Sequence, residues 1–166
     1  MNFIFLDIDG VLNNDRTTAQ SPNGFVGLSD SLLKKLKHLK KETDSVIVLT
    51  SSWKDASKED YDYMMRKLKK FECTPLGRTY EKNGNGELRG QAISKYVKNN
   101  EITNWVILDD CLYDFKQYPE IMMHLVHTDY HEGLTDEDVE LAKKILKNDN
   151  IKISELIEEQ GWNYHR

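Results

Sequence analysis

Short apolar runs alternate with amphipathic stretches along this chain. Residues 2–8, 45–50 and 105–108 are dominated by apolar side chains over lengths that suit buried strands. Residues 124–128 predict a fourth strand, and residues 73–76 are expected to form a further short one. Near-continuous apolar strands are typical of a parallel sheet whose two faces are both covered by helices.

Helical periodicity fills the intervals between these runs. Leucines recur at helical spacing over residues 32–39, with Ser29 as the expected N-cap. The other predicted helices cover residues 57–71, a stretch marked by Ile93, Tyr96 and Val97 that ends near 99–100, residues 136–146 behind Thr135, and a short tail helix over 153–160. Strands that alternate with helices predict an α/β fold with a mainly parallel sheet.

The chain is expected to form one domain over residues 1–166, because no repeat, low-complexity tract or linker divides it. A glycine-rich loop through Gly84, Gly86 and Gly90 is expected before the third helix. With 39% hydrophobic and 31% charged residues, the composition suits a soluble globular protein. The apolar runs are too short to span a bilayer and no signal peptide is recognisable, so we expect a cytoplasmic protein without a membrane partner.

Charge and cysteine usage exclude some classes of function. A net charge of -5 argues mildly against nonspecific affinity for nucleic acid, and the lysines of residues 34–41 are interpreted as a solvated helix face. Cys73 and Cys111 are far apart in the sequence, so neither a disulfide framework nor a zinc site is expected.

Polar residues follow three of the predicted core strands. They are Asp7 and Asp9 after the first strand, Thr50, Ser51 and Ser52 after the second, and Asp109 and Asp110 after the third. In an open parallel α/β sheet, ligands bind beyond the carboxyl ends of the strands. We therefore expect these residues to converge on one site although they are distant in sequence.

Such a group of carboxylates favours Mg²⁺, which takes hard oxygen ligands and is usually held by one or two carboxylates together with substrate phosphate. A carboxylate at Asp7 can attack phosphorus, and Asp9, two residues on, can protonate the leaving oxygen and then activate water. Thr50 and Ser51 can bind the phosphoryl oxygens. Arg89 is the best placed cation, with Lys95 as the reserve.

Each of these residues also has a structural interpretation. Asp7 and Asp9 can be turn formers at the end of a strand, and Thr50 to Ser52 and the later acidic pair can cap helices. Arg89 can equally be a surface residue. Trp53 is interpreted as a packing residue, with stacking on a base as the alternative. The histidines, His124 and His127 among them, have no ligand spacing and are interpreted as structural.

The motif sequences resemble a known family. The segment 7–12, Asp-Ile-Asp-Gly-Val-Leu after an apolar strand, is similar to the first motif of the haloacid dehalogenase (HAD) superfamily of phosphatases. Residues 46–50 resemble its second motif and residues 106–110 its fourth. The combination of residues 50–53 with 133–135 resembles the branch found as the HAD domain of Swiss army knife RNA-repair proteins.

The resemblance implies a three-layer Rossmann-like fold and assigns roles to single residues. Asp7 would be the nucleophile and a Mg²⁺ ligand, and Asp9 the general acid and base, with its backbone carbonyl on the metal. Thr50 would bind phosphate and Arg89, where lysine is commoner, would be the cation. Asp110 would be a metal ligand, supported by Asp109 and Asp114, with the division of labour among these three left open.

The predicted function is that of a Mg²⁺-dependent phosphomonoester hydrolase that works through an aspartyl-phosphate. The intervals 14–44 and 53–88 are too short for a full cap domain, so we expect a minimal cap and an open site. An open site suits a large substrate such as a nucleic-acid end or a protein, and it is also compatible with small phosphoesters. The substrate that we predict is a nucleic-acid end or a nucleotide, with a sugar phosphate as the alternative. Two rival classes are a receiver-like phospho-acceptor domain, disfavoured by the order of the acidic motifs, and a catalytically idle binding module.

Overall fold

A single parallel sheet forms the centre of the protein. The computed structural model describes residues 1–81 and 88–147. Its strands lie in the order β3–β2–β1–β4–β5, and every pairing between neighbours is parallel. The strands are β1 (Asn2–Leu6), β2 (Ser45–Leu49), β3 (Gly77–Arg78), β4 (Asn104–Asp109) and β5 (Leu125–His127). The prediction of an α/β fold with a parallel sheet is confirmed.

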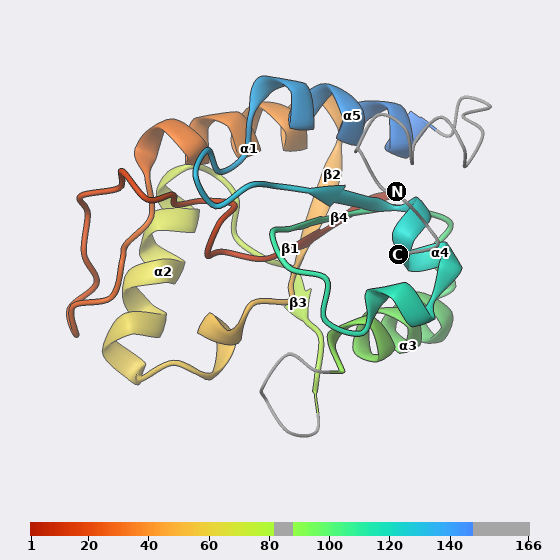
Figure 1. Cartoon of the computed structure of the whole chain (residues 1–166), viewed down its shortest axis with the longest axis horizontal. Helices are drawn as coiled ribbons and strands as arrows, with labels where there is room; N and C mark the ends of the chain where they lie inside the picture. The colour runs from red at the N-terminus through yellow and green to blue at the C-terminus, as the bar shows by residue number, and fades with distance from the viewer. Residues whose placement is uncertain (82–87, 148–166) are drawn as a thin grey trace.

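Helices cover both faces of this sheet and complete three layers (Figure 1). One face packs against α1 (Asp30–Thr43), α2 (Lys58–Lys70) and α5 (Asp136–Lys147), and the other against α3 (Arg89–Asn99) and α4 (Pro119–Met123). The short 3-10 helices η1 (Ser52–Asp55) and η2 (Phe115–Gln117) follow β2 and β4. The layers explain the apolar sequence of the strands.

β1 shows why the strand pattern is continuous rather than alternating. Ile4 and Leu6 join the core beneath α1, α2 and α5, whereas Phe5 joins the core beneath α3 and α4. Successive side chains of a strand point to opposite faces. Because both faces are covered, each of these side chains has to be apolar.

The structure differs from the predictions at the less regular elements. The strand expected over residues 73–76 lies instead at Gly77–Arg78, an edge pairing of two residues that has no apolar pattern. The helix α4 was not predicted, and it takes His124 as its C-cap, so β5 begins one residue later than expected. The predicted tail helix over 153–160 and the loop glycines Gly84 and Gly86 lie outside the described residues.

The chain between β1 and α1 forms no separate domain. In the described residues it contains no helix or strand, only an isolated bridge between Gln20 and Val26. We call residues 20–28 the β1–α1 loop; it lies beside α2 (Figure 1). The Asn23 N–H donates to Asp60 Oδ1 at 3.1 Å, and the Leu28 N–H donates to the Tyr63 hydroxyl at 3.1 Å.

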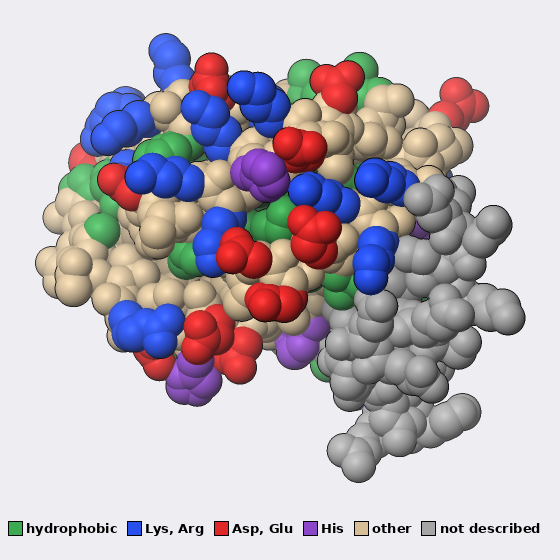
Figure 2. All heavy atoms as spheres, turned by 90° about the horizontal axis from the view of Figure 1, so that it is seen from above, with side chains coloured by type: hydrophobic (Ala, Val, Ile, Leu, Met, Phe, Trp, Pro, Cys, Tyr) green, Lys and Arg blue, Asp and Glu red, His purple; other side chains and the backbone are tan. Residues whose placement is uncertain are grey.

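The outer face of α1 and α5 carries charges of both signs. Figure 2 shows Lys and Arg side chains interspersed with Asp and Glu on this face. Lys35 lies 3.6 Å from Asp136, and Lys37 lies 2.7 Å from Glu72. Intermixed charges of this kind are typical of a solvated surface. Among the described residues, no helix has the length and apolar character needed to cross a membrane.

Candidate active site

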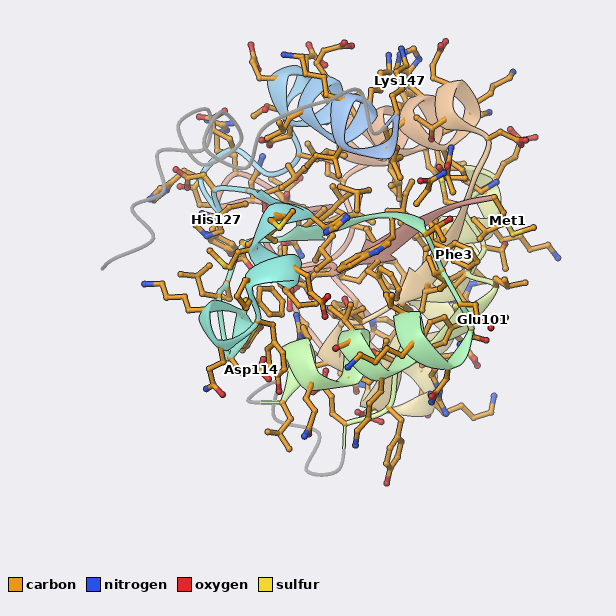
Figure 3. The ribbon with its side chains drawn as sticks, turned by 90° about the vertical axis from the view of Figure 1, so that its right-hand side faces the viewer. Met1, Phe3, Glu101, Asp114, His127 and Lys147 are labelled. Atoms are coloured by element: carbon orange, nitrogen blue, oxygen red, sulfur yellow. The ribbon has the colours of Figure 1, made fainter. Side chains whose placement is uncertain are left out.

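The carboxyl ends of β1, β2 and β4 bring the predicted polar residues together. Asp7 follows β1, Thr50 follows β2 and Asp109 is the last residue of β4. Because the three strands are in register here, these residues stand side by side, and the Asp7 and Thr50 N–H groups continue the ladder. In Figure 3 this end of the sheet is the one labelled by Asp114 and His127.

Arg89 is a buried cation between two of these carboxylates. Its side chain is 2% exposed, with Nη1 3.2 Å from Asp7 Oδ1 and 2.8 Å from Asp109 Oδ2. Its Nε lies 3.6 Å from Glu81 Oε1, and the ring of Tyr113 covers the guanidinium with 4.2 Å between Cζ and the ring centroid. Arg89 is therefore a residue of the site and not of the surface.

The first turn of α3 fixes the position of Arg89. Both carboxylate oxygens of Asp114 accept backbone N–H groups of this turn, from Gly90 at 2.6 Å and from Gln91 at 3.1 Å. Asp114 lies next to the start of α3 (Figure 3). Gly90 permits this contact, since a Cβ there would be 2.8 Å from Asp114 Oδ1. Lys95, the reserve cation, is exposed further along the same helix.

Asp110 is half-buried and packs against the loop after β1. Gly10 has a φ of +78°, and a Cβ at this position would lie 2.2 Å from Asp110 Oδ2. The Thr128 hydroxyl donates to the Gly10 carbonyl at 2.7 Å, and His127 Nε2 lies 2.8 Å from the Asp110 carbonyl oxygen. A glycine is therefore required where this loop meets the Asp110 carboxylate.

The crowding of carboxylates shifts their protonation. Burial, and after it the charge of Asp109, raises the pKa of Asp7 well above its usual range, although Arg89 opposes this. Burial also raises the pKa of Asp109, and burial and Asp7 together raise the pKa of Asp110 to about 6. Burial would lower the pKa of Arg89, but Asp7 and Asp109 raise it. One guanidinium does not offset three carboxylates, so the site favours a further cation.

The donor set identifies which residues can hold such a cation. Both oxygens of Asp109 are engaged, by Arg89 and by the Cys111 N–H at 3.0 Å, whereas Asp110 offers a half-buried carboxylate next to Asp7. The ligand atoms of Asp109, Asp110 and Cys111 lie within 4.8 Å of one another, but burial raises the pKa of the Cys111 thiol to about 11. A protonated thiol is a poor ligand, so hard oxygen donors remain, and these fit Mg²⁺.

Asp9 is exposed at the rim of the site and is held by two donors. Its Oδ1 accepts the Asn13 Nδ2 at 2.9 Å and the Trp53 Nε1 at 3.1 Å. Asn13 is fully buried, and its own Oδ1 accepts the Gly10 N–H at 2.9 Å. Trp53 is 6% exposed, so it packs as predicted, but its indole also holds the Asp9 carboxylate. The sequence analysis did not include Asn13 or this hydrogen bond.

The segment after β2 supplies hydroxyl groups and a second buried cation. Thr50 is fully buried, and its Oγ1 has no hydrogen-bond partner among the described residues. The Ser51 hydroxyl accepts the Trp53 N–H at 3.1 Å and caps η1. Lys54 Nζ lies 3.4 Å from the Thr50 carbonyl, 3.3 Å from the Ser51 carbonyl and 3.6 Å from Glu81 Oε1.

Burial lowers the pKa of Lys54, and Glu81 counteracts this. The sequence analysis missed Lys54 and Glu81. For Lys54, the available signal in the sequence was its position four residues after Thr50, because a residue there can fold back onto the end of β2.

A cavity of about 740 Å³ opens next to Asp9. It lies between the β1–α1 loop, the start of α2 and the loop after β5. Its walls are mainly apolar and are formed by Asp9, Asn23, Phe25, Val26, Ser52, Trp53, Ala56, Ser57, Asp60 and Tyr130.

A parallel sheet between two layers of helices, with acidic residues at the carboxyl ends of β1 and β4, defines a Rossmann-like α/β protein. Residues 3–139 match the family described as the HAD domain in Swiss Army Knife RNA repair proteins. The chain belongs to this family, which indicates a hydrolase of the HAD type. Comparison with curated proteins finds no match.

Proposed function

We propose that this protein is a Mg²⁺-dependent phosphomonoester hydrolase with Asp7 as its nucleophile. The observation that carries the proposal is the buried group of Asp7, Asp109 and Arg89, joined by Asp110. A buried, solvent-shielded carboxylate next to a fixed guanidinium suits attack on an anionic phosphoryl group, because the protein charges are already in position.

The proposed reaction consists of two successive displacements at phosphorus. An Asp7 oxygen attacks phosphorus and forms an aspartyl-phosphate, while the bond to the leaving oxygen breaks and that oxygen takes a proton from Asp9. Asp9 then accepts a proton from water, which attacks the aspartyl-phosphate. This step releases inorganic phosphate and regenerates Asp7. Asp9 is suited to this role because it is exposed at the rim while Asn13 and Trp53 hold one of its oxygens.

The phosphoryl oxygens would be bound by Thr50, Ser51 and Arg89. A buried hydroxyl without a partner is costly, so the Thr50 Oγ1 favours a ligand that can accept its hydrogen bond. Mg²⁺, held by Asp7, Asp110 and the Asp9 carbonyl with Asp109 behind them, would neutralise the repulsion between the anionic nucleophile and the anionic substrate. Arg89 keeps the Asp7 carboxylate oriented.

The phosphorylated end of a nucleic acid or a nucleotide is the substrate class that we propose. Support comes from the family, whose description refers to RNA repair proteins, and from the lack of a cap domain in the described chain. A small sugar phosphate is the alternative, and a receiver-like phospho-acceptor is the less favoured one.

The test is phosphate release by the purified protein from an aryl phosphate and from a panel of 3′- and 5′-phosphorylated oligonucleotides, nucleotides and sugar phosphates. We expect turnover with Mg²⁺, its loss with a chelator, and its loss in Asp7→Asn. Equal rates for wild type and Asp7→Asn would refute the nucleophile. Better turnover of sugar phosphates than of nucleic-acid ends would refute the substrate class, and one slow phosphorylation without turnover would favour the receiver-like alternative.

A further inference from the structure

The cavity next to Asp9 is lined by apolar side chains that remain in contact with solvent. Phe25 is 64% exposed, Tyr130 40% and Val26 37%. Two of these residues come from the β1–α1 loop and one from the loop after β5, so they approach the cavity from different segments. Large exposed apolar side chains gathered around a cavity of about 740 Å³ are typical of a ligand site, since pockets of roughly 300–1,000 Å³ hold small organic ligands.

The wall that carries Phe25 is fixed in place before any ligand arrives. Asn23 donates from its backbone N–H and from Nδ2 to the two oxygens of the buried Asp60, at 3.1 and 3.2 Å. Asn23 Nδ2 also donates to the Ser57 hydroxyl at 2.8 Å. The loop is thus tied to the start of α2 through Asn23, two residues before Phe25. A preorganised wall loses little conformational freedom on binding.

The position of Asp9 determines which part of a substrate this cavity can hold. Asp9 lines the cavity, whereas Asp7 and Arg89 lie buried at the strand ends and do not line it. In the proposed reaction Asp9 protonates the leaving oxygen, so the leaving group departs on the side of Asp9. The cavity is therefore on the leaving-group side of the phosphoryl position.

We propose that this cavity is the leaving-group subsite and that it selects phosphomonoesters whose leaving group carries a planar aromatic ring. The inference rests on the proposed hydrolase function and adds to it the chemistry of the substrate beyond the phosphate. Phe25 and Tyr130 supply aromatic rings to the lining, and Val26 and Trp53 supply further apolar surface. A planar aromatic ring gains binding free energy from contacts with aromatic and apolar side chains, and an aliphatic polyol does not.

The test compares the steady-state hydrolysis of 1-naphthyl phosphate with that of glycerol 2-phosphate in wild type and Phe25→Ala. Leu76→Ala is the matched control, because Leu76 is equally exposed, at 65%, but lies outside the cavity. Removing one stacking partner weakens the binding of a ring by roughly tenfold. We expect Phe25→Ala to lower kcat/KM for the naphthyl ester about tenfold through KM, with a much smaller change for the glycerol ester. The ratio of the two esters should be the same in Leu76→Ala as in wild type.

Comparing variants removes the intrinsic difference in reactivity between the two esters. Tyr130→Ala is the second variant, in the loop after β5, and should lower the same ratio. Equal losses for both esters in both variants, or none, would overturn the subsite while leaving the hydrolase function standing. If wild type hydrolyses neither ester under any metal condition, the hydrolase function fails and the subsite fails with it.

Discussion

The hydrogen bond from Trp53 to Asp9 allows a sharp test of the proton transfer. Trp53→Phe removes the indole N–H that lies 3.1 Å from Asp9 Oδ1 and keeps an aromatic ring in the same space. The other donor to this oxygen, Asn13 Nδ2 at 2.9 Å, remains. With one donor left, the carboxylate gains rotational freedom, and it is held less firmly in the orientation that proton transfer to the leaving oxygen would need.

The size of the effect follows from the strength of the bond. A hydrogen bond to a charged group is worth about 1.5–3 kcal/mol, which corresponds to roughly ten- to a hundredfold in rate if all of it acts in the transition state. Because Asn13 still holds the oxygen, we expect the lower end, about tenfold. The loss should appear only where the leaving oxygen needs a proton, so phenyl phosphate should be slowed and 4-nitrophenyl phosphate hardly at all.

The assay is kcat across a series of substituted phenyl phosphates of graded leaving-group acidity. All members carry the same ring, so binding in the cavity cancels along the series. Trp105→Phe is the matched control, since Trp105 is 5% exposed and packs in the core beneath α3 and α4, away from Asp9. Both variants should lose some stability, on the order of 1–3 kcal/mol, because both leave a void in a packed core.

Only Trp53→Phe should make kcat depend more steeply on the leaving group. If it slows every member of the series by the same factor, or slows none, the indole does not orient Asp9 for proton transfer.

Other positions give independent predictions. Gly10→Ala should cost about 1–2 kcal/mol of stability from its positive φ, and its Cβ should displace the Asp110 carboxylate and abolish the thermal stabilisation by Mg²⁺. Asp114→Ala and Thr135→Ala each remove side-chain acceptors from the start of a helix, so each should cost about 0.5–2 kcal/mol in denaturant unfolding. Only Asp114→Ala should also lower kcat, because α3 carries Arg89, the cation that we propose binds the phosphoryl group. Burial lowers the pKa of His124, so the unfolded chain takes up this proton more readily than the folded protein. The free energy of unfolding should therefore be highest above about pH 6.5 and fall below it, by at most about 1.4 kcal/mol per pH unit.

Each of these predictions has a comparison that isolates its cause. Gly24→Ala shares the positive φ, at +86°, without any contact, so it should lose similar stability and keep the response to Mg²⁺. Equal loss of the Mg²⁺ response in both glycine variants would exclude the steric explanation. For the pH dependence, His124→Phe should reduce the loss of unfolding free energy below about pH 6.5. Replacing the exposed His38 by Gln should leave that loss unchanged. The same loss in His124→Phe as in wild type would show that His124 is not its cause.

The sequence predicted the central part of the fold because that part depends on burial alone. β1, β2 and β4 are covered on both faces, and their apolar runs follow from this. β3 was misplaced because Gly77 and Arg78 pair with β2 through their backbone, which leaves no trace in side-chain polarity. α4 was missed because five residues give too little periodicity to detect.

The same distinction holds within the site. The carboxyl ends of parallel strands lie at the same edge of a sheet, and this rule predicted the convergence of Asp7, Thr50 and Asp109. The hydrogen bond between Asp9 and Trp53 joins residues 44 positions apart and depends on the turn of η1, so no sequence pattern predicts it. The burial of Lys54 is likewise a tertiary property. In the sequence, the neighbours of Lys54 are those of an ordinary surface lysine.

The central place of β1 in the sheet has a consequence for the biosynthesis of this protein. β1 is paired on one side with β2, about forty residues later, and on the other with β4, about a hundred residues later. Pairings of such sequence separation form slowly, because a long loop must close first. A ribosome-bound chain that stops before β4 would therefore expose one edge of β1. The Asp7 and Asp109 carboxylates come together late in synthesis, and a partly made chain is a candidate for chaperone binding.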